Sequence, residues 1–133
     1  MLEKDELQAR GFRNVAENGK VIGFQIPFRL TDYRGYWLSQ LTDATVTVNG
    51  EKFEGDQVTW IIHGITYQQK DLPNNPNVHW SPLEPAIFNV NKPGGLKLGI
   101  HDVDIAFGHS TSYIPSTEWA GITSHKRRMT LAG

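Results

Sequence analysis

The sequence predicts an all-β fold, a two-layer antiparallel β-sandwich of about six to eight strands with long aromatic loops. Several short segments alternate apolar and polar residues with a period of two, as half-buried strands do. The chain has 13 Gly and 7 Pro residues, which supply turns between such segments. A length of 133 residues fits one domain with its own core. These features together favour the sandwich over helical or mixed folds.

The clearest strand covers residues 22–30, where apolar side chains occupy every second position. Pro27 lacks the N–H that a β-ladder uses, so we expect this strand at a sheet edge or at a bulge. Asn49-Gly50 between two extended runs predicts a hairpin, because both residues tolerate positive φ. Gly64 after the next strand is interpreted as a bulge. Further strands are expected over residues 44–48, 58–63, 86–90, 101–107 and 128–131.

The domain division predicted from the sequence is simple. Residues 1–10 form an N-terminal arm or a short helix, since only residues 2–10 have helical composition, and residues 11–133 form the single sandwich domain. The acidic start lacks the apolar stretch of a signal peptide, and no segment approaches the ~20 apolar residues of a membrane helix. We therefore expect a cytoplasmic protein without a membrane partner.

Composition excludes several classes of site. With 13 Lys and Arg against 14 Asp and Glu, the chain has no basic excess suited to nucleic acid. The absence of cysteine excludes disulfides, thiolate nucleophiles and Cys-containing zinc sites. The five histidines lack His-x-His or His-x-x-x-His spacing, so no metal site is expected in this chain. Asp102 and Asp104 point to one face of a strand, where a solvated surface explains them better than a calcium site.

No catalytic residue is predicted. The carboxylates that lie in predicted loops show no spacing that selects an acid/base pair; they are Glu17, Asp32, Glu84 and Glu118. The sequence also lacks a Gly-x-Ser-x-Gly nucleophile turn, a P-loop and a Gly-x-Gly-x-x-Gly fingerprint. Taken alone, the chain is typical of a domain that lacks its own catalytic machinery.

Three long segments carry aromatic residues that either cap the open ends of the sandwich or contact a partner or ligand; they are residues 31–42, 68–85 and 109–126. Tyr, Trp and Arg are enriched at interface hot spots. We therefore predict a partner interface formed by Tyr33, Arg34, Gly35, Tyr36 and Trp37. Loops close to a pocket are expected to contribute His79, Trp80, Tyr113 and Trp119.

Six short motifs occur in series between residues 11 and 131. They are Gly11-Phe12-Arg13-Asn14-Val15, residues 19–24, Tyr33-Arg34-Gly35 with Leu38-Ser39, residues 46–51, His63-Gly64 with Thr66-Tyr67, and Lys92-Pro93-Gly94-Gly95-Leu96 through His101. In this order they resemble the small β subunit of bacterial C-glycoside deglycosidases. The proline-rich stretch Asp71–Pro85 and the long segment Ser110–Ser124 depart from that pattern, which leaves the aglycone preference open.

The resemblance implies a non-catalytic β-sandwich subunit that binds no cofactor itself. Its expected partner is a large α subunit with a TIM-barrel fold, which holds a divalent metal such as Mn²⁺ and the catalytic groups. The expected reaction of the complex is lyase-like cleavage of the C–C bond between a 3-keto sugar and an aromatic, flavonoid-type aglycone. The substrate, a 3-keto C-glycoside, is reached through the complex.

Two other functions stay open. A carbohydrate-binding module would stack sugars on Trp37, Trp80 or Trp119, and the isolated domain would then bind free glycans. A stand-alone hydrolase would require turnover by the purified chain, and the sequence offers no catalytic pair for it.

Overall fold

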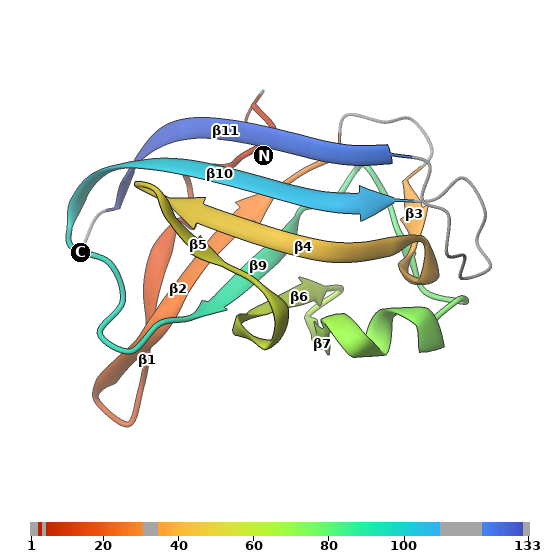
Figure 1. Cartoon of the computed structure of the whole chain (residues 1–133), viewed down its shortest axis with the longest axis horizontal. Coiled ribbons are helices and arrows are strands. Elements are labelled where there is room, and N and C mark those ends of the chain that lie inside the picture. The colour runs from red at the N-terminus through yellow and green to blue at the C-terminus, as the bar shows by residue number, and fades with distance from the viewer. Residues whose placement is uncertain (1–2, 4, 31–34, 110–120, 132–133) are drawn as a thin grey trace.

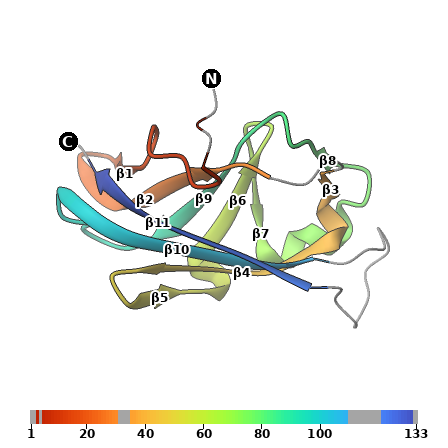
Figure 2. The ribbon, with the colours of Figure 1, turned by 90° about the horizontal axis from the view of Figure 1, so that it is seen from above.

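In the computed structural model, two antiparallel β-sheets face each other across one core, and their strands cross obliquely (Figure 1, Figure 2). The structure describes residues 3, 5–30, 35–109 and 121–131. The first sheet contains, in spatial order, β1 (Arg13–Glu17), β2 (Lys20–Phe28), β9 (Ala86–Asn91), β6 (Val58–Ile62) and β7 (Ile65–Gln68). The second contains β11 (Gly121–Leu131), β10 (Gly99–His109), β4 (Leu41–Val48) and β5 (Glu51–Phe53). The all-β prediction is confirmed.

A third, two-stranded sheet pairs β3 (Tyr36–Trp37) with β8 (His79–Trp80) at one end of the sandwich. The described residues thus form eleven strands, more than the six to eight expected. The strands β3 and β8 have two residues each and carry no period-two signal, and the short strands β1 and β7 were not expected either. Three short 3₁₀-helices connect strands: η1 (Leu38–Gln40), η2 (Gly55–Gln57) and η3 (Gln69–Asn74). None of the helices in the described ranges has the length and apolar composition needed to cross a membrane.

Aromatic side chains from both sheets form the centre of the core. The Phe28 ring lies 4.2 Å from the Phe88 ring between centroids, and the Trp60 ring lies 5.4 Å from Phe107 on the opposite sheet. The Trp80 ring packs edge-on to Phe28 at 5.3 Å. Tilted and edge-to-face pairs of this kind add about 0.5–1.5 kcal/mol each beyond the burial of apolar area. This cluster joins the two sheets and extends to the β3–β8 end.

The strand β2 shows the predicted alternation but not the predicted position. Phe24, Ile26 and Phe28 are buried, whereas Ile22 is 38% exposed near the start of the strand. β2 lies between β1 and β9, so it is not an edge strand. Pro27 is tolerated there because its carbonyl accepts a hydrogen bond from the Gln8 N–H (2.9 Å), so its missing donor faces the N-terminal arm.

Three hairpins turn through pairs of residues with positive φ. Asn49-Gly50 joins β4 to β5 with φ of 51° and 87°, as predicted. His63-Gly64 joins β6 to β7 in the same way with φ of 57° and 76°, so Gly64 belongs to a turn and the expected bulge is wrong. A third pair, Asn18-Gly19, joins β1 to β2.

Residues 5–10 contain no helix; they run along the end of β2 as an extended arm. Leu7 is buried and forms an isolated bridge with Phe28. The Arg127 guanidinium reaches this arm, contacting the Glu3 carboxylate at 3.0 Å and the Leu7 carbonyl at 2.8 Å. The arm therefore covers the inward face of β11.

That contact explains why β11 is longer than the expected strand over residues 128–131. Its inward positions at Thr123, His125 and Arg127 are polar, and the arm contacts His125 and Arg127. Both faces of the strand are therefore polar over most of its length, and the period-two hydrophobic signal is lost.

Candidate functional site

The β3–β8 pair brings together residues that the sequence assigned to two different sites. Tyr36 is opposite Trp80, and Trp37 is opposite His79. The predicted interface segment and the predicted pocket-proximal loop therefore share one end of the sandwich, at the right of Figure 1. Four residues of these two predictions lie outside the described residues: Tyr33, Arg34, Tyr113 and Trp119.

Gly35 permits this close pairing. It has a positive φ of 70°, which favours glycine, and a Cβ placed there would collide with the carbonyl oxygen of Trp80. The same Cβ would lie 2.9 Å from the His79 ring. Backbone geometry therefore requires glycine at this position. Gly35 contributes to the predicted interface only indirectly, because it allows β3 to approach β8.

The three aromatic residues of this pair differ in exposure. Trp80 is fully buried, and its indole N–H donates to the Glu84 carbonyl at 3.0 Å. Tyr36 is also buried, with its ring 5.2 Å from that of His109. Trp37 is 37% exposed and contacts the His79 ring edge-on at 4.9 Å. Tyr36 and Trp80 therefore cap the core, whereas Trp37 presents part of its ring to the surface.

His63 connects the β6–β7 turn to this pair. Its Nε2–H donates to the His79 carbonyl at 2.7 Å, and its Nδ1 lies 3.0 Å from a carboxylate oxygen of Glu84. Both ring nitrogens are therefore occupied, which leaves His63 no nitrogen with which to act as a general base on a ligand. The arrangement fixes the positions of three chain segments.

The sequence gives no sign of the contact between His63 and Glu84, because it indicates His63 only as part of a motif and Glu84 only as an unpaired carboxylate. His63 and Glu84 lie 21 positions apart, and no motif of fixed spacing links them. A weak signal was the His63-Gly64 pair itself, because a residue followed by glycine between two strands is typical of a two-residue turn.

Carboxylates and histidines elsewhere in the described chain do not converge. Within residues 3, 5–30, 35–109 and 121–131, no three His, Asp or Glu side chains are placed to hold a metal ion. Glu17 is exposed in the β1–β2 hairpin and Glu84 contacts His63, so these two do not form an acid/base pair. Asp32 and Glu118 lie outside the described residues.

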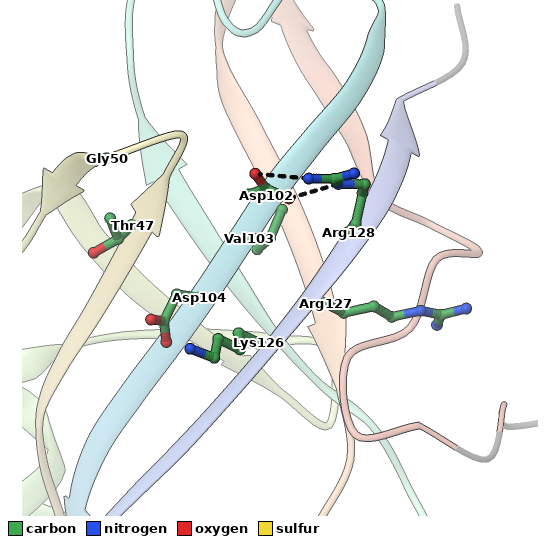
Figure 3. Close-up of a pocket in the computed structure, with 8 residues that line it drawn as sticks. All are labelled: Thr47, Gly50, Asp102, Val103, Asp104, Lys126, Arg127 and Arg128. Carbon is green, nitrogen blue, oxygen red and sulfur yellow. Dashed lines mark hydrogen bonds and ion pairs between the residues drawn. The ribbon is translucent and has the colours of Figure 1, made fainter.

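A shallow hollow of about 460 Å³ lies on the outer face of the four-stranded sheet (Figure 3). Its lining residues come from β4, β10 and β11 and the β4–β5 turn: Thr47, Gly50, Asp102, Val103, Asp104, Lys126, Arg127 and Arg128. Arg128 donates to Asp102 at 2.8 Å, and this hydrogen bond holds the pKa of Asp102 below its ordinary value. Asp104 is the cross-strand neighbour of Lys126, while Arg127 points to the other side of β11 (Figure 3).

The charges of this hollow are balanced. Each acidic residue has a basic residue directly across from it on the neighbouring strand. Such cross-strand pairs stabilise an exposed sheet face modestly and leave no excess charge of one sign for a ligand. The solvated outer face expected for Asp102 and Asp104 is what the structure shows.

Comparison with known proteins identifies the family. The family model described as C-glycoside deglycosidase beta subunit matches residues 2–113. A protein of Eubacterium cellulosolvens named C-glycoside deglycosidase beta subunit is 39% identical over 129 residues, which cover 96% of this chain and 88% of that protein. A protein of the same name from Arthrobacter globiformis is 33% identical over 58 residues, 44% of each chain. This chain therefore belongs to the C-glycoside deglycosidase beta subunit family.

Proposed function

We propose that this chain is the non-catalytic β subunit of a heteromeric C-glycoside deglycosidase. The observation that carries the proposal is the family membership, with a relative matched over almost the whole chain. The described side chains support it, because those gathered at the β3–β8 end are engaged in fixing the backbone. The catalytic groups are then supplied by a larger α subunit, which we propose to be a TIM barrel.

The proposed substrate is a 3-keto C-glycoside with an aromatic, flavonoid-type aglycone. A C-glycosidic bond has no leaving oxygen to protonate, so cleavage needs another route. The ketone at C3 acidifies the C–H at C2, and a base can remove that proton to form an enediolate. Lewis-acid stabilisation of the enediolate is the chemistry that a divalent metal such as Mn²⁺ on the α subunit would supply. Elimination then breaks the C1–aglycone bond, and the aglycone carbon takes up a proton.

Co-expression with the large subunit tests this function. The candidate partner is a sugar-isomerase-like TIM-barrel protein encoded in the adjacent reading frame. We expect the two chains to co-purify, and we expect the complex to release aglycone from a 3-keto C-glycoside, measured by liquid chromatography. The small chain alone should release none. Full activity of the large chain alone, together with failure to co-purify, would contradict the proposal.

A carbohydrate-binding module is the second candidate, and the partial exposure of Trp37 is the observation that favours it. Trp80 cannot serve as a sugar platform because it is buried in the core. Titration of the isolated chain with free glycosides, followed by tryptophan fluorescence, distinguishes the candidates. Saturable quenching would favour a module, and no quenching would favour the subunit.

A further inference from the structure

We propose that the β3–β8 end of the sandwich is the surface that docks onto the larger subunit. This surface, here called the tryptophan end, consists of Trp37, His63, His79, Leu83 and Glu84. The inference rests on the proposed function, because the occupant is the partner subunit of that complex. A family of β subunits implies that some face of the chain is covered by a partner.

Two exposed apolar side chains supply the contact area. Leu83 is 88% exposed, and Trp37 carries the large amphipathic ring that is most enriched among interface hot spots. Each is coupled to the same polar network: Trp37 contacts the His79 ring, and Leu83 is the neighbour of Glu84, which contacts His63. The two segments that carry them are therefore joined through His63 and His79, although Trp37 and Leu83 lie 46 positions apart in the sequence.

The backbone beneath these side chains is already fixed. His63 joins the β6–β7 turn, β8 and Glu84, as described above. The turn that presents Leu83 is closed by the Glu84 N–H donating to the Ser81 carbonyl at 3.2 Å. The Leu83 N–H also donates to the Ser81 hydroxyl at 3.1 Å. A surface ordered before binding loses less conformational entropy on association, so a given contact area gives higher affinity.

Other exposed faces of the described chain fit a partner less well. Leu98 and Ile100 are 65% and 67% exposed, but they lie where β10 begins, at the end of the molecule opposite β3 (Figure 1). No aromatic ring accompanies them among the exposed large apolar residues there. The hollow on the outer sheet is lined by charges that are balanced within the chain. Among the described residues, only the tryptophan end combines an exposed indole, an exposed leucine and a backbone fixed by hydrogen bonds, and its residues lie within the family match.

The test uses matched surface variants in the assembled complex. Trp37→Ala and Leu83→Ser remove apolar contact at the tryptophan end, whereas Leu98→Ser and Ile100→Ser remove exposed apolar side chains at the opposite end. Binding to the purified large subunit is measured by biolayer interferometry, and thermal melting of each isolated chain checks folding. We expect Kd to rise roughly tenfold or more for each tryptophan-end variant, as hot-spot truncations do, and less than about twofold for the controls.

The outcomes separate this inference from the proposed function. If the unmodified chain does not bind the large subunit at all, the proposed function fails. If it binds and Trp37→Ala and Leu83→Ser leave Kd unchanged, the inference fails and the function stands, whatever the controls do. A third outcome would also overturn the docking surface, in favour of a ligand site. In that outcome a free C-glycoside quenches the tryptophan fluorescence of the isolated chain saturably, and Trp37→Ala abolishes the quenching but leaves binding to the large subunit unchanged.

Discussion

At the scale of single residues, glycine and histidine at positive φ determine the candidate surface. Gly35 allows β3 to approach β8, and His63 occupies a left-handed turn position from which its ring reaches two other segments. Left-handed backbone costs a non-glycine residue about 1–2 kcal/mol. At His63 the two ring contacts offset that cost, which gives the residue a structural reason to be histidine.

Gly35→Ala should destabilise the chain by more than its backbone conformation alone predicts. The new Cβ meets the Trp80 carbonyl, so the pair must separate, and overpacking of this kind costs about 1–3 kcal/mol. Gly19→Ala is the matched control, because Gly19 also has positive φ but has open space around a Cβ. Urea denaturation measures both variants. Equal losses of unfolding free energy in the two would show that the β3–β8 contact is not tight.

At the scale of elements, the N-terminal arm and β11 depend on each other. The arm contributes Glu3, Asp5 and Glu6, which contact Arg127 and His125 on the inward face of β11. The arm also pairs with the end of β2, beyond the point where β1 begins. It therefore completes one sheet and covers the edge strand of the other, which is how the first residues come to stabilise the last strand.

Glu3 should make this contact pH-dependent. Its pKa is lowered in the folded chain, chiefly by the hydrogen bond from the Arg10 backbone N–H and further by Arg127. A carboxyl group whose pKa is lowered in the folded chain stabilises the fold at pH values above its unfolded pKa, about 4.5. This stabilisation disappears as the pH falls through the lower pKa of the folded chain.

The variant Glu3→Gln tests that dependence. We expect a lower unfolding free energy than in the unmodified chain at pH 6, with the difference shrinking progressively below about pH 4.5, as measured by urea denaturation across pH 3–7. Glu17→Gln, at an exposed hairpin position, is the control and should show little difference at any pH. If the difference in unfolding free energy between Glu3→Gln and the unmodified chain stays constant down to pH 3, the charge-based explanation is refuted.

At the scale of the whole molecule, the same end of the sandwich closes the core and carries the proposed docking surface. The aromatic core joins the two sheets, and its last members, Tyr36 and Trp80, close the end on whose surface Trp37 lies. Recognition then depends on how rigidly this end is held. His63, which spans three segments, is the residue through which such rigidity can be changed without altering the exposed apolar side chains.

His63→Asn should weaken assembly more than it weakens the fold. Asparagine tolerates the positive φ, so the turn is retained while the contacts to His79 and Glu84 are lost. A hydrogen bond and a partly exposed close contact to a carboxylate contribute about 1–2 kcal/mol together to stability. The expected result is a small fall in melting temperature and a several-fold rise in Kd for the large subunit. Glu84→Gln, which keeps an acceptor oxygen, should have a smaller effect on both. Unchanged Kd for His63→Asn would remove His63 as a positioning residue.

The sequence by itself determined the features that local patterns encode. Alternation identified β2, and the Asn49-Gly50 pair identified a hairpin, because side-chain period and turn conformation depend on neighbouring residues. The motifs also indicated the family that the comparisons confirm. The aromatic segment around Trp37 was recognised as a candidate surface from residue type alone.

Only the tertiary structure decided which of those residues face outward and which meet. It buried Trp80 and Tyr36, joined His63 to Glu84, and placed polar residues of β11 against the arm. Contacts between segments far apart in the chain produce no periodic signal in the sequence. Their pairing is determined by how the two sheets stack and close around the core, and that is a property of the folded chain as a whole.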